Sequence, residues 1–213
     1  HGFPALEDMN DLTTAVLELD RATSTPELVQ ATRAICALND ADAAPTLIKV
    51  LSYNNPAVAA IATQGLIALG RVVVPELLSS MNTGNYGARA WVVKALAALR
   101  DPRGLDLLDH ALRADIAPSV RRSAARGLAE LDLDLPDQTD GLVRCCEGLL
   151  QAGVDDEWVV RYAAAYGLEQ RLVSRDLTPS LQTKAMTVLS QLASVQEPCL
   201  LYTSPSPRDR PLS

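Results

Sequence analysis

Three arginines recur at one equivalent position in successive segments of the chain. Arg89, Arg121 and Arg161 each stand six residues before an alanine or a glycine. Because the planar guanidinium group can bind a carboxylate through two parallel hydrogen bonds, such a column fits an anion-binding surface. It equally fits a structural ladder, in which each arginine bonds an acidic side chain at a neighbouring turn, with Asp40 and Asp101 as the expected partners. The residue types alone favour the ladder.

Aromatic side chains gather in the same segments. Aromatics make up only 4% of the chain, yet both tryptophans and three of the five tyrosines lie there. Tyr86 and Trp158 precede equivalent helical patterns, Trp91 lies inside one, and Tyr162 and Tyr166 lie inside another. The spacing of Trp158, Tyr162 and Tyr166 puts them on one helix face. A stripe of this kind is most often part of a core, but beside the arginines it favours a binding surface.

Ordinary catalytic motifs are absent from the sequence. There is no glycine-rich phosphate loop, G-x-S-x-G elbow or H-E-x-x-H pair, and the only histidines are His1 and His110. The four cysteines form no C-x-x-C pair, so neither a metal site nor a disulfide framework is predicted. We expect small buried thiols in a reducing cytoplasm, with no catalytic role for Cys145 and Cys146.

The charge of the chain limits its partners. With 26 acidic and 19 basic side chains, the net charge is −7, which disfavours nucleic acid, whose binding relies on Lys and Arg. The longest apolar runs are interrupted by Arg, Asn or Pro, so no membrane span is predicted. His1–Asn10 lacks the basic start and the apolar stretch of a signal peptide.

Five segments of similar pattern repeat along the chain at steps of 31, 30, 32 and 40 residues. Each presents small and large apolar residues at i, i+3 and i+4, the stripe of an amphipathic helix, and a second helical pattern follows each of the first four. The segments are LVQATRAICALND from Leu28, AAIATQGLIALGR from Ala59, RAWVVKALAALRD from Arg89, RRSAARGLAELDL from Arg121 and RYAAAYGLEQRLV from Arg161. The pattern predicts an all-α fold, a HEAT-like α-α superhelical solenoid of about five helix pairs.

The limits of the repeats give the predicted organisation. Residues 1–11 are expected to be a flexible N-terminal end, 12–195 the HEAT-repeat solenoid, and 196–213 a disordered tail rich in Pro, Ser and Arg. The longer fourth step is assigned to an extended acidic loop at Asp132–Thr139. The tail also resembles translated adapter or vector sequence, so it is assigned no function. A chain that starts without Met is expected to be a fragment or a processed product.

Four longer segments within the repeats resemble phycobilin lyases of the E/F type. They are YNNPAVAAIATQGLIALG (Tyr53–Gly70), NYGARAWVVKALAALRDPRGLDLL (Asn85–Leu108), APSVRRSAARGLAEL (Ala117–Leu131) and EWVVRYAAAYGLE (Glu157–Glu169). The resemblance extends from about Leu12 to Val195 and is greatest to the F-type, or beta, subunits of the lyase for the phycocyanin alpha chain. The run NYGARAW, followed by DPRGL and PSVRRSAARGL, is more specific than general HEAT similarity.

The resemblance implies a subunit of a heterodimeric lyase that serves the phycobilisome, the photosynthetic antenna of cyanobacteria. An E-type partner and an F-type subunit together hold phycocyanobilin, which is bound as a substrate without a separate cofactor, and attach it by a thioether to a cysteine of the phycocyanin alpha subunit. Since the nucleophile belongs to the acceptor, the lyase needs none of its own, and positioning supplies much of the rate. The arginines are then expected to bind the propionates and the aromatics to pack against the rings. The expected bilin-binding residues are Arg89, Arg121, Arg122, Arg161, Tyr86, Trp91, Trp158 and Tyr162.

Other functions remain open from the sequence. One is a HEAT-repeat adaptor or chaperone for phycobiliproteins without a part in the chemistry. Others are a lyase that acts on phycoerythrin, an isomerising lyase, and a protein that assists bilin removal. A binding-only protein would leave the rate of bilin attachment to cysteine unchanged.

Overall fold

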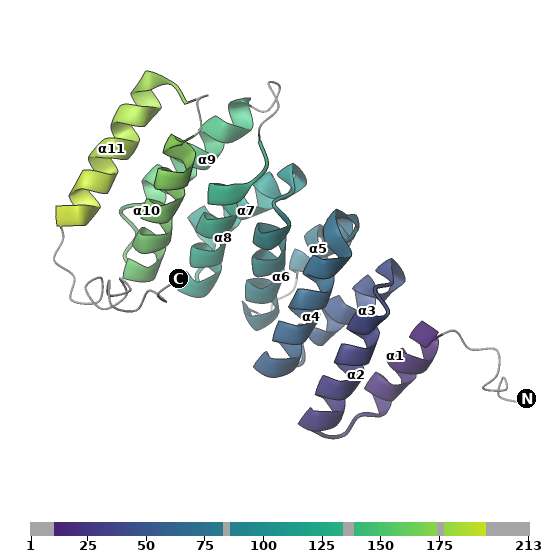
Figure 1. Ribbon diagram of the computed structural model, residues 1–213. Coiled ribbons are helices and arrows are strands. Elements are labelled where there is room, and N and C mark those ends of the chain that lie inside the picture. Colours follow the sequence, from purple (N-terminus) through teal and green to yellow (C-terminus); the bar gives the residue numbers. More distant parts are fainter. Residues whose placement is uncertain (1–10, 83–85, 134–138, 174–176, 195–213) are drawn as a thin grey trace, which may run out of the picture.

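The chain folds as a stack of helix pairs in two layers (Figure 1). The computed structural model describes residues 11–82, 86–133, 139–173 and 177–194, and these contain no β-strand. The first helices of the pairs stand side by side in the front layer of Figure 1: α2 (Thr25–Ala37), α4 (Pro56–Leu69), α6 (Tyr86–Leu99), α8 (Pro118–Glu130) and α10 (Trp158–Leu172). Behind them lie α3 (Ala44–Val50), α5 (Val74–Ser79), α7 (Leu105–Ala114) and α9 (Thr139–Ala152).

One helix lies at each end of the stack. The first helix, α1 (Asp11–Arg21), packs on α2, and the last, α11 (Pro179–Ser194), packs on α10 and α9. With α11 as the partner of α10, the described chain has five helix pairs. The predicted all-α solenoid is therefore confirmed. The predicted N-terminal end (1–11), acidic loop (132–139) and tail (196–213) lie largely outside the described residues. Of these positions, the structure describes Asp11 and Thr139, which begin α1 and α9, and residues 132 and 133.

The small residues of the repeat allow the layers to approach closely. A Cβ atom added to Gly127 would lie 2.9 Å from Leu108 Cδ1 and 3.0 Å from Ala97 Cβ. At Gly167 the added atom would lie 2.7 Å from Leu149 Cδ2. A side chain at either position would force the neighbouring leucines to shift, so glycine is favoured where α8 and α10 cross the adjacent helices.

The large apolar residue that follows each small one anchors the core. All five are at most 1% exposed and belong to one continuous hydrophobic cluster, and burial of each contributes roughly 1.5–3 kcal/mol. They are Ile35, Leu66, Leu96, Leu128 and Leu168. The core therefore runs through the stack from one repeat to the next, as expected for a solenoid whose units cannot bury their apolar faces alone.

The helix starts follow from local sequence. The Ser24 side chain accepts from the N–H of Glu27, and the Glu27 carboxylate accepts from the N–H of Ser24, which forms a capping box at α2. At α4 the Asn55 side chain accepts from the N–H groups of Ala57 and Val58, and Pro56 takes the first helical position.

One apolar run departs from the expectation that no segment could span a membrane. By length and composition alone, Pro56–Ser79 would be long and apolar enough. In the structure this run is two helices, α4 and α5, joined by a 3-10 turn at Gly70–Val73, where Gly70 has φ of 79°. Most of its apolar side chains pack in the solenoid core, although Val72 is 59% exposed. A buried helix of a soluble protein can therefore match a membrane span in length and composition.

Candidate functional site

The arginine column forms a ladder along the turns that lead into the front-layer helices. Arg121 donates from Nε and Nη2 to the two carboxylate oxygens of Asp155, at 2.8 and 2.9 Å, and from Nη1 to the Asp115 carbonyl at 2.9 Å. Arg89, one repeat earlier, forms an ion pair with the Asp115 carboxylate. Arg89 and Arg121 therefore each bond the aspartate of the following turn and tie one repeat to the next.

The contacts of the ladder shift the pKa values of Asp155 and Arg121. Burial by itself would raise the pKa of the Asp155 carboxyl, but hydrogen bonds from Arg121 and from the Glu157 N–H hold that pKa below its ordinary value. The hydrogen bonds to the Asp155 carboxylate in turn raise the pKa of the Arg121 guanidinium group. The side chains of Arg121 and Asp155 are only 15% and 13% exposed, so this pair is partly shielded from solvent.

The acidic partners expected from the sequence were wrong. Asp40 accepts from the N–H of Asp42 at the start of a 3-10 turn, and Asp101 pairs with Arg103 at 2.7 Å. Both aspartates follow the C-terminal end of a front-layer helix, whereas the arginine column lies near the N-terminal end. Twelve residues separate Arg89 from Asp101, which is about 18 Å along a helix, so the two cannot meet.

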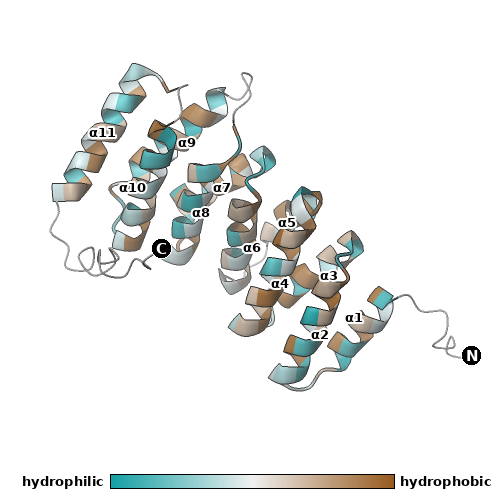
Figure 2. Cartoon of the chain, in the orientation of Figure 1, coloured by the Kyte–Doolittle hydropathy of each residue, from teal (hydrophilic) through white to brown (hydrophobic). Residues whose placement is uncertain are grey.

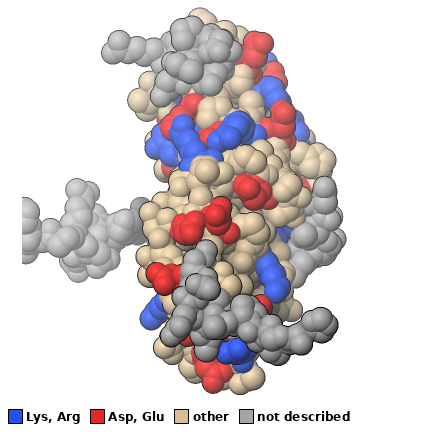
Figure 3. Space-filling view, turned by 90° about the vertical axis from the view of Figure 1, so that its right-hand side faces the viewer, with Lys and Arg blue, Asp and Glu red and all other residues tan. Residues whose placement is uncertain are grey.

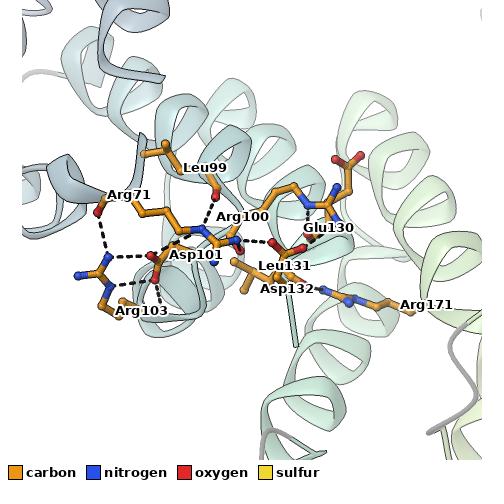
Figure 4. A network of polar contacts seen from close by, with 9 residues as sticks. All are labelled: Arg71, Leu99, Arg100, Asp101, Arg103, Glu130, Leu131, Asp132 and Arg171. Carbon is orange, nitrogen blue, oxygen red and sulfur yellow. Dashed lines mark hydrogen bonds and ion pairs between the residues drawn. The ribbon is translucent and has the colours of Figure 1, made fainter. Parts of the chain in front are cut away.

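A second polar network occupies that C-terminal edge (Figure 4). Arg71 donates to the Leu99 carbonyl at 3.3 Å, and Arg100 donates to the Glu130 carbonyl at 2.8 Å. The buried Arg171 donates to the carbonyl of Leu128, at 2.9 and 2.7 Å, and to that of Leu131. These cations satisfy carbonyls that a helix leaves without partners at its C-terminal end, where positive charge is also favourable. This network is structural.

A pocket at the end of the stack collects three of the predicted bilin-binding residues. It lies between α10 and α11 and has a volume of about 600 Å³. We call it the end pocket. Its wall is mostly apolar and consists of Trp158, Arg161, Tyr162, Ala165, Glu169, Leu172, Met186, Leu189, Ser190, Leu192 and Ala193. Of the predicted residues, the structure therefore brings together Trp158, Arg161 and Tyr162.

The end pocket lies at the last helix pair that the structure describes. On α10 its residues recur at i, i+3, i+4, i+7, i+11 and i+14, from Trp158 to Leu172, which is the face turned away from Gly167 and the core. Alongside this face lies α11, the last helix described, and it supplies the second wall. Tyr162 and Met186 remain 45% and 56% exposed. Large apolar side chains are thus left at the surface of one end.

Two polar side chains stand on the same wall of the end pocket. Arg161 donates from Nη1 to the carbonyls of Asp155 and Asp156, at 2.7 and 2.9 Å, which holds its guanidinium group at the N-terminal end of α10. Glu169 lies two turns further along the helix, and its carboxylate has no hydrogen bond or ion pair with any residue that the structure describes. The pocket therefore carries a cation towards one end and an anion towards the other.

The other predicted residues lie elsewhere. Arg89 and Arg121 belong to the ladder, Arg122 is exposed on α8, and the half-buried Trp91 on α6 has Lys94 Nζ 5.0 Å from its ring centre. The side chain of Tyr86 lies outside the described residues. Sequence reasoning missed Glu169 and the whole α11 wall, since it considered only aromatic and basic residues in the first helix of each repeat.

The nucleophilic and metal-binding groups support a site without its own nucleophile. Burial raises the pKa of Cys145 to about 12 and that of Cys146 to about 11, so both stay protonated near neutral pH. His110 is exposed on α7 and lines a separate hollow with Arg89. Across the described ranges, no cluster of three His, Cys, Asp or Glu side chains could hold a metal ion. On the face drawn in Figure 3, acidic and basic side chains are interspersed.

Fold and site together define a HEAT-repeat solenoid with an aromatic pocket at one end, and sequence comparisons agree. A family model described as HEAT repeats matches residues 54–129 and 74–169, and one described as PBS lyase HEAT-like repeat matches residues 28–53. The chain is 52% identical over 192 residues to the bilin biosynthesis protein RpcF of Synechococcus sp. (strain WH8020), covering 90% of this chain and 91% of that protein. It is 45% identical over 170 residues to the phycocyanobilin lyase subunit beta of Nostoc sp. (strain PCC 7120 / SAG 25.82 / UTEX 2576), covering 78% and 85%.

A solved structure gives the same result. The structure of the complex of CpcE and CpcF of phycocyanin lyase from Nostoc sp. PCC7120 contains a chain that matches with a TM-score of 0.68 at 44% identity, covering 76% of this chain and 96% of that one. The protein belongs to the family of phycocyanobilin lyase beta subunits and related bilin biosynthesis proteins. The resemblance seen in the sequence is therefore confirmed.

Proposed function

We propose that this protein is the F-type subunit of a heterodimeric bilin lyase, which attaches phycocyanobilin by a thioether to a cysteine of the phycocyanin alpha subunit. The names of its relatives and the CpcE–CpcF complex support this assignment. The chain is expected to act only together with an E-type partner, in the cytoplasm, with the bilin as its substrate and no separate cofactor.

The end pocket is the observation that carries the proposal. Its volume of about 600 Å³ falls within the range of small-molecule sites, and its wall is largely apolar with few polar groups. A bilin has a flat conjugated system and two propionates. Trp158 and Tyr162 offer ring faces for stacking, and the Arg161 guanidinium offers donors for a carboxylate.

The two charged side chains give the bilin a direction in the pocket. Arg161 and Glu169 are eight residues apart on α10, or about 12 Å along the helix axis. We place a propionate beside Arg161 and the pyrrole N–H groups towards Glu169, because a carboxylate is an acceptor of hydrogen bonds and not a donor at neutral pH. The bilin then lies along α10 with its rings against Trp158 and Tyr162.

The attachment reaction requires no nucleophile and no redox group from the lyase. The thiol of the acceptor adds across a carbon–carbon double bond of the bilin: a C–S bond forms, the thiol proton passes to the bilin, and no oxidant or reductant is consumed. A holder that fixes the bilin before the thiol arrives makes this step effectively unimolecular. The buried, protonated thiols of Cys145 and Cys146 agree with that role.

A matched pair of tryptophan variants tests the proposal. Trp158→Leu removes a ring from the end pocket, and Trp91→Leu removes a half-buried ring from α6, away from that pocket. With the E-type partner, phycocyanobilin and the acceptor subunit present, the initial rate of covalent attachment should fall about tenfold or more in Trp158→Leu only. Equal rates in both variants would contradict the assignment of the pocket. An unchanged rate with and without this protein would favour the adaptor or chaperone function.

A further inference from the structure

The charge of the front layer differs from that of the chain as a whole. The five front-layer helices carry eight basic and three acidic side chains, although the whole chain has a net charge of −7. In the second helices of the pairs, four basic side chains stand against five acidic ones. Positive charge is thus concentrated on one layer of an acidic protein.

Some of the basic side chains of the front layer stabilise the solenoid, and others have no such role. Arg89 and Arg121 form the ladder and Arg171 caps α8, as described above. Arg33, Lys94 and Arg126 differ, because all three are exposed and none forms an ion pair with a residue of the described ranges. Among the described residues, no carboxylate therefore neutralises these three cations.

The three cations share one repeat position, immediately before the small residue of α2, α6 and α8. In a solenoid, equivalent positions on neighbouring helices line up, about 8–10 Å from one helix to the next. Gln64 and Tyr166 occupy the same position on α4 and α10. We call Arg33, Lys94 and Arg126 the basic ridge. Figure 2 shows hydrophilic residues recurring along the visible face of the front-layer helices.

The basic ridge leads to the mouth of the end pocket. The Arg126 guanidinium lies 4.4 Å from the ring centre of Tyr166, whose hydroxyl donates to Glu130 at 2.6 Å. Tyr162, one helical turn before Tyr166, lines the pocket and is half exposed. Arg126, at one end of the ridge, thus contacts a residue one helical turn from the wall of the end pocket.

We propose that the basic ridge is the docking surface for the acceptor alpha subunit, which contacts it through an acidic patch near its bilin-accepting cysteine. This inference rests on the proposed function, since only a lyase must bring an acceptor thiol to the end pocket. Exposed cations attract an acidic protein and orient it during the encounter when no carboxylate of the described residues pairs with them, even where an aromatic ring lies beside the cation as at Lys94 and Arg126. From α2 to α8 the ridge crosses three helix-to-helix steps, or about 24–30 Å, which fits contact with the surface of a folded protein.

Charge-neutralising variants test the ridge. The variant carries Arg33→Gln, Lys94→Gln and Arg126→Gln. A matched control carries Arg21→Gln, Lys49→Gln and Lys184→Gln, which remove the same charge from exposed positions on α1, α3 and α11. With the E-type partner and phycocyanobilin at saturation, the acceptor concentration is varied at low and at physiological ionic strength, and KM and kcat for attachment are measured.

The ridge variant should raise the acceptor KM about tenfold at low ionic strength, leave kcat within about twofold, and weaken the salt dependence of KM. The control should leave KM within about twofold. An unchanged KM in the ridge variant, or the same rise in the control, would overturn the proposal. If the ridge variant no longer elutes with the E-type partner on a sizing column, the ridge binds that partner instead. This result would also overturn the proposal.

A direct binding measurement separates this inference from the proposed function. Titration of the acceptor apo-subunit into the complex of this protein and its E-type partner, without bilin, reports docking alone. Binding that weakens about tenfold in the ridge variant would support the ridge as a docking surface. If the attachment assay then gave no bound bilin, that failure would count against the lyase assignment and not against the ridge. Equal binding by the ridge variant and the wild type would end the proposal, as would preferential binding of a nucleic-acid duplex to the ridge.

Discussion

Replacement of Arg121 by glutamine should destabilise the protein without weakening bilin binding by its folded form. The Arg121 side chain donates two hydrogen bonds to the Asp155 carboxylate and two to backbone carbonyls, and the pair is about six-sevenths buried. Breaking a fully buried ion pair costs about 3–5 kcal/mol, and hydrogen bonds to charged groups contribute about 1.5–3 kcal/mol. Because this pair keeps some exposure, a loss of about 2–3 kcal/mol is expected, or a fall in Tm of about 4–12 °C for a chain of this size.

Urea denaturation followed by far-UV circular dichroism measures the stability, and bilin titration of the folded variant measures the affinity. Arg161→Gln is the matched comparison, since Arg161 holds the same repeat position but lines the end pocket. That variant should weaken bilin binding about tenfold. The reasoning is refuted if Arg121→Gln unfolds at the wild-type urea concentration, or if it weakens bilin binding as much as Arg161→Gln does.

Three further outcomes follow from the structure. Replacing both Cys145 and Cys146 by Ala should leave attachment per folded molecule unchanged, because both thiols are buried with raised pKa; complete loss of attachment by folded protein would contradict this. Gly167→Ala should cost about 1–2 kcal/mol in urea denaturation, since its Cβ would lie 2.7 Å from a core leucine atom, whereas Gly104→Ala, with its nearest contact at 3.6 Å, should be close to neutral. Stability should fall as pH decreases below about 4, because the lowered pKa of Asp155 stabilises the fold only while the carboxyl is ionised, and this fall should be smaller in Arg121→Gln.

The solenoid could be predicted from sequence because its determinants are local and repeated. Gly127 and Gly167 mark helix crossings, and Leu128 and Leu168 follow them into the core at the same spacing. A pattern with this period leaves few alternative folds, since each unit can bury its apolar face only against its neighbours. The arginine ladder could be predicted for the same reason.

The acidic partners of the arginine ladder and the end pocket could not be predicted from the repeat pattern. The partner of Arg121 is Asp155, 34 residues away, and which aspartate it meets depends on the end of the helix at which each lies. The end pocket depends on how α11 packs beside α10, and the sequence of α11 lacks the repeat pattern. The apolar spacing of Leu181, Ala185 and Leu189 was the available signal for that wall.

Covalent attachment in a reconstituted system tests the central claim most directly. Purified acceptor alpha subunit and phycocyanobilin are incubated with this protein, with the E-type partner, with both, or with neither, and the product is denatured and inspected for bilin that remains bound to the polypeptide. The account predicts rapid thioether formation at one acceptor cysteine only when both subunits are present. Attachment at the same rate with the E-type partner alone would contradict it.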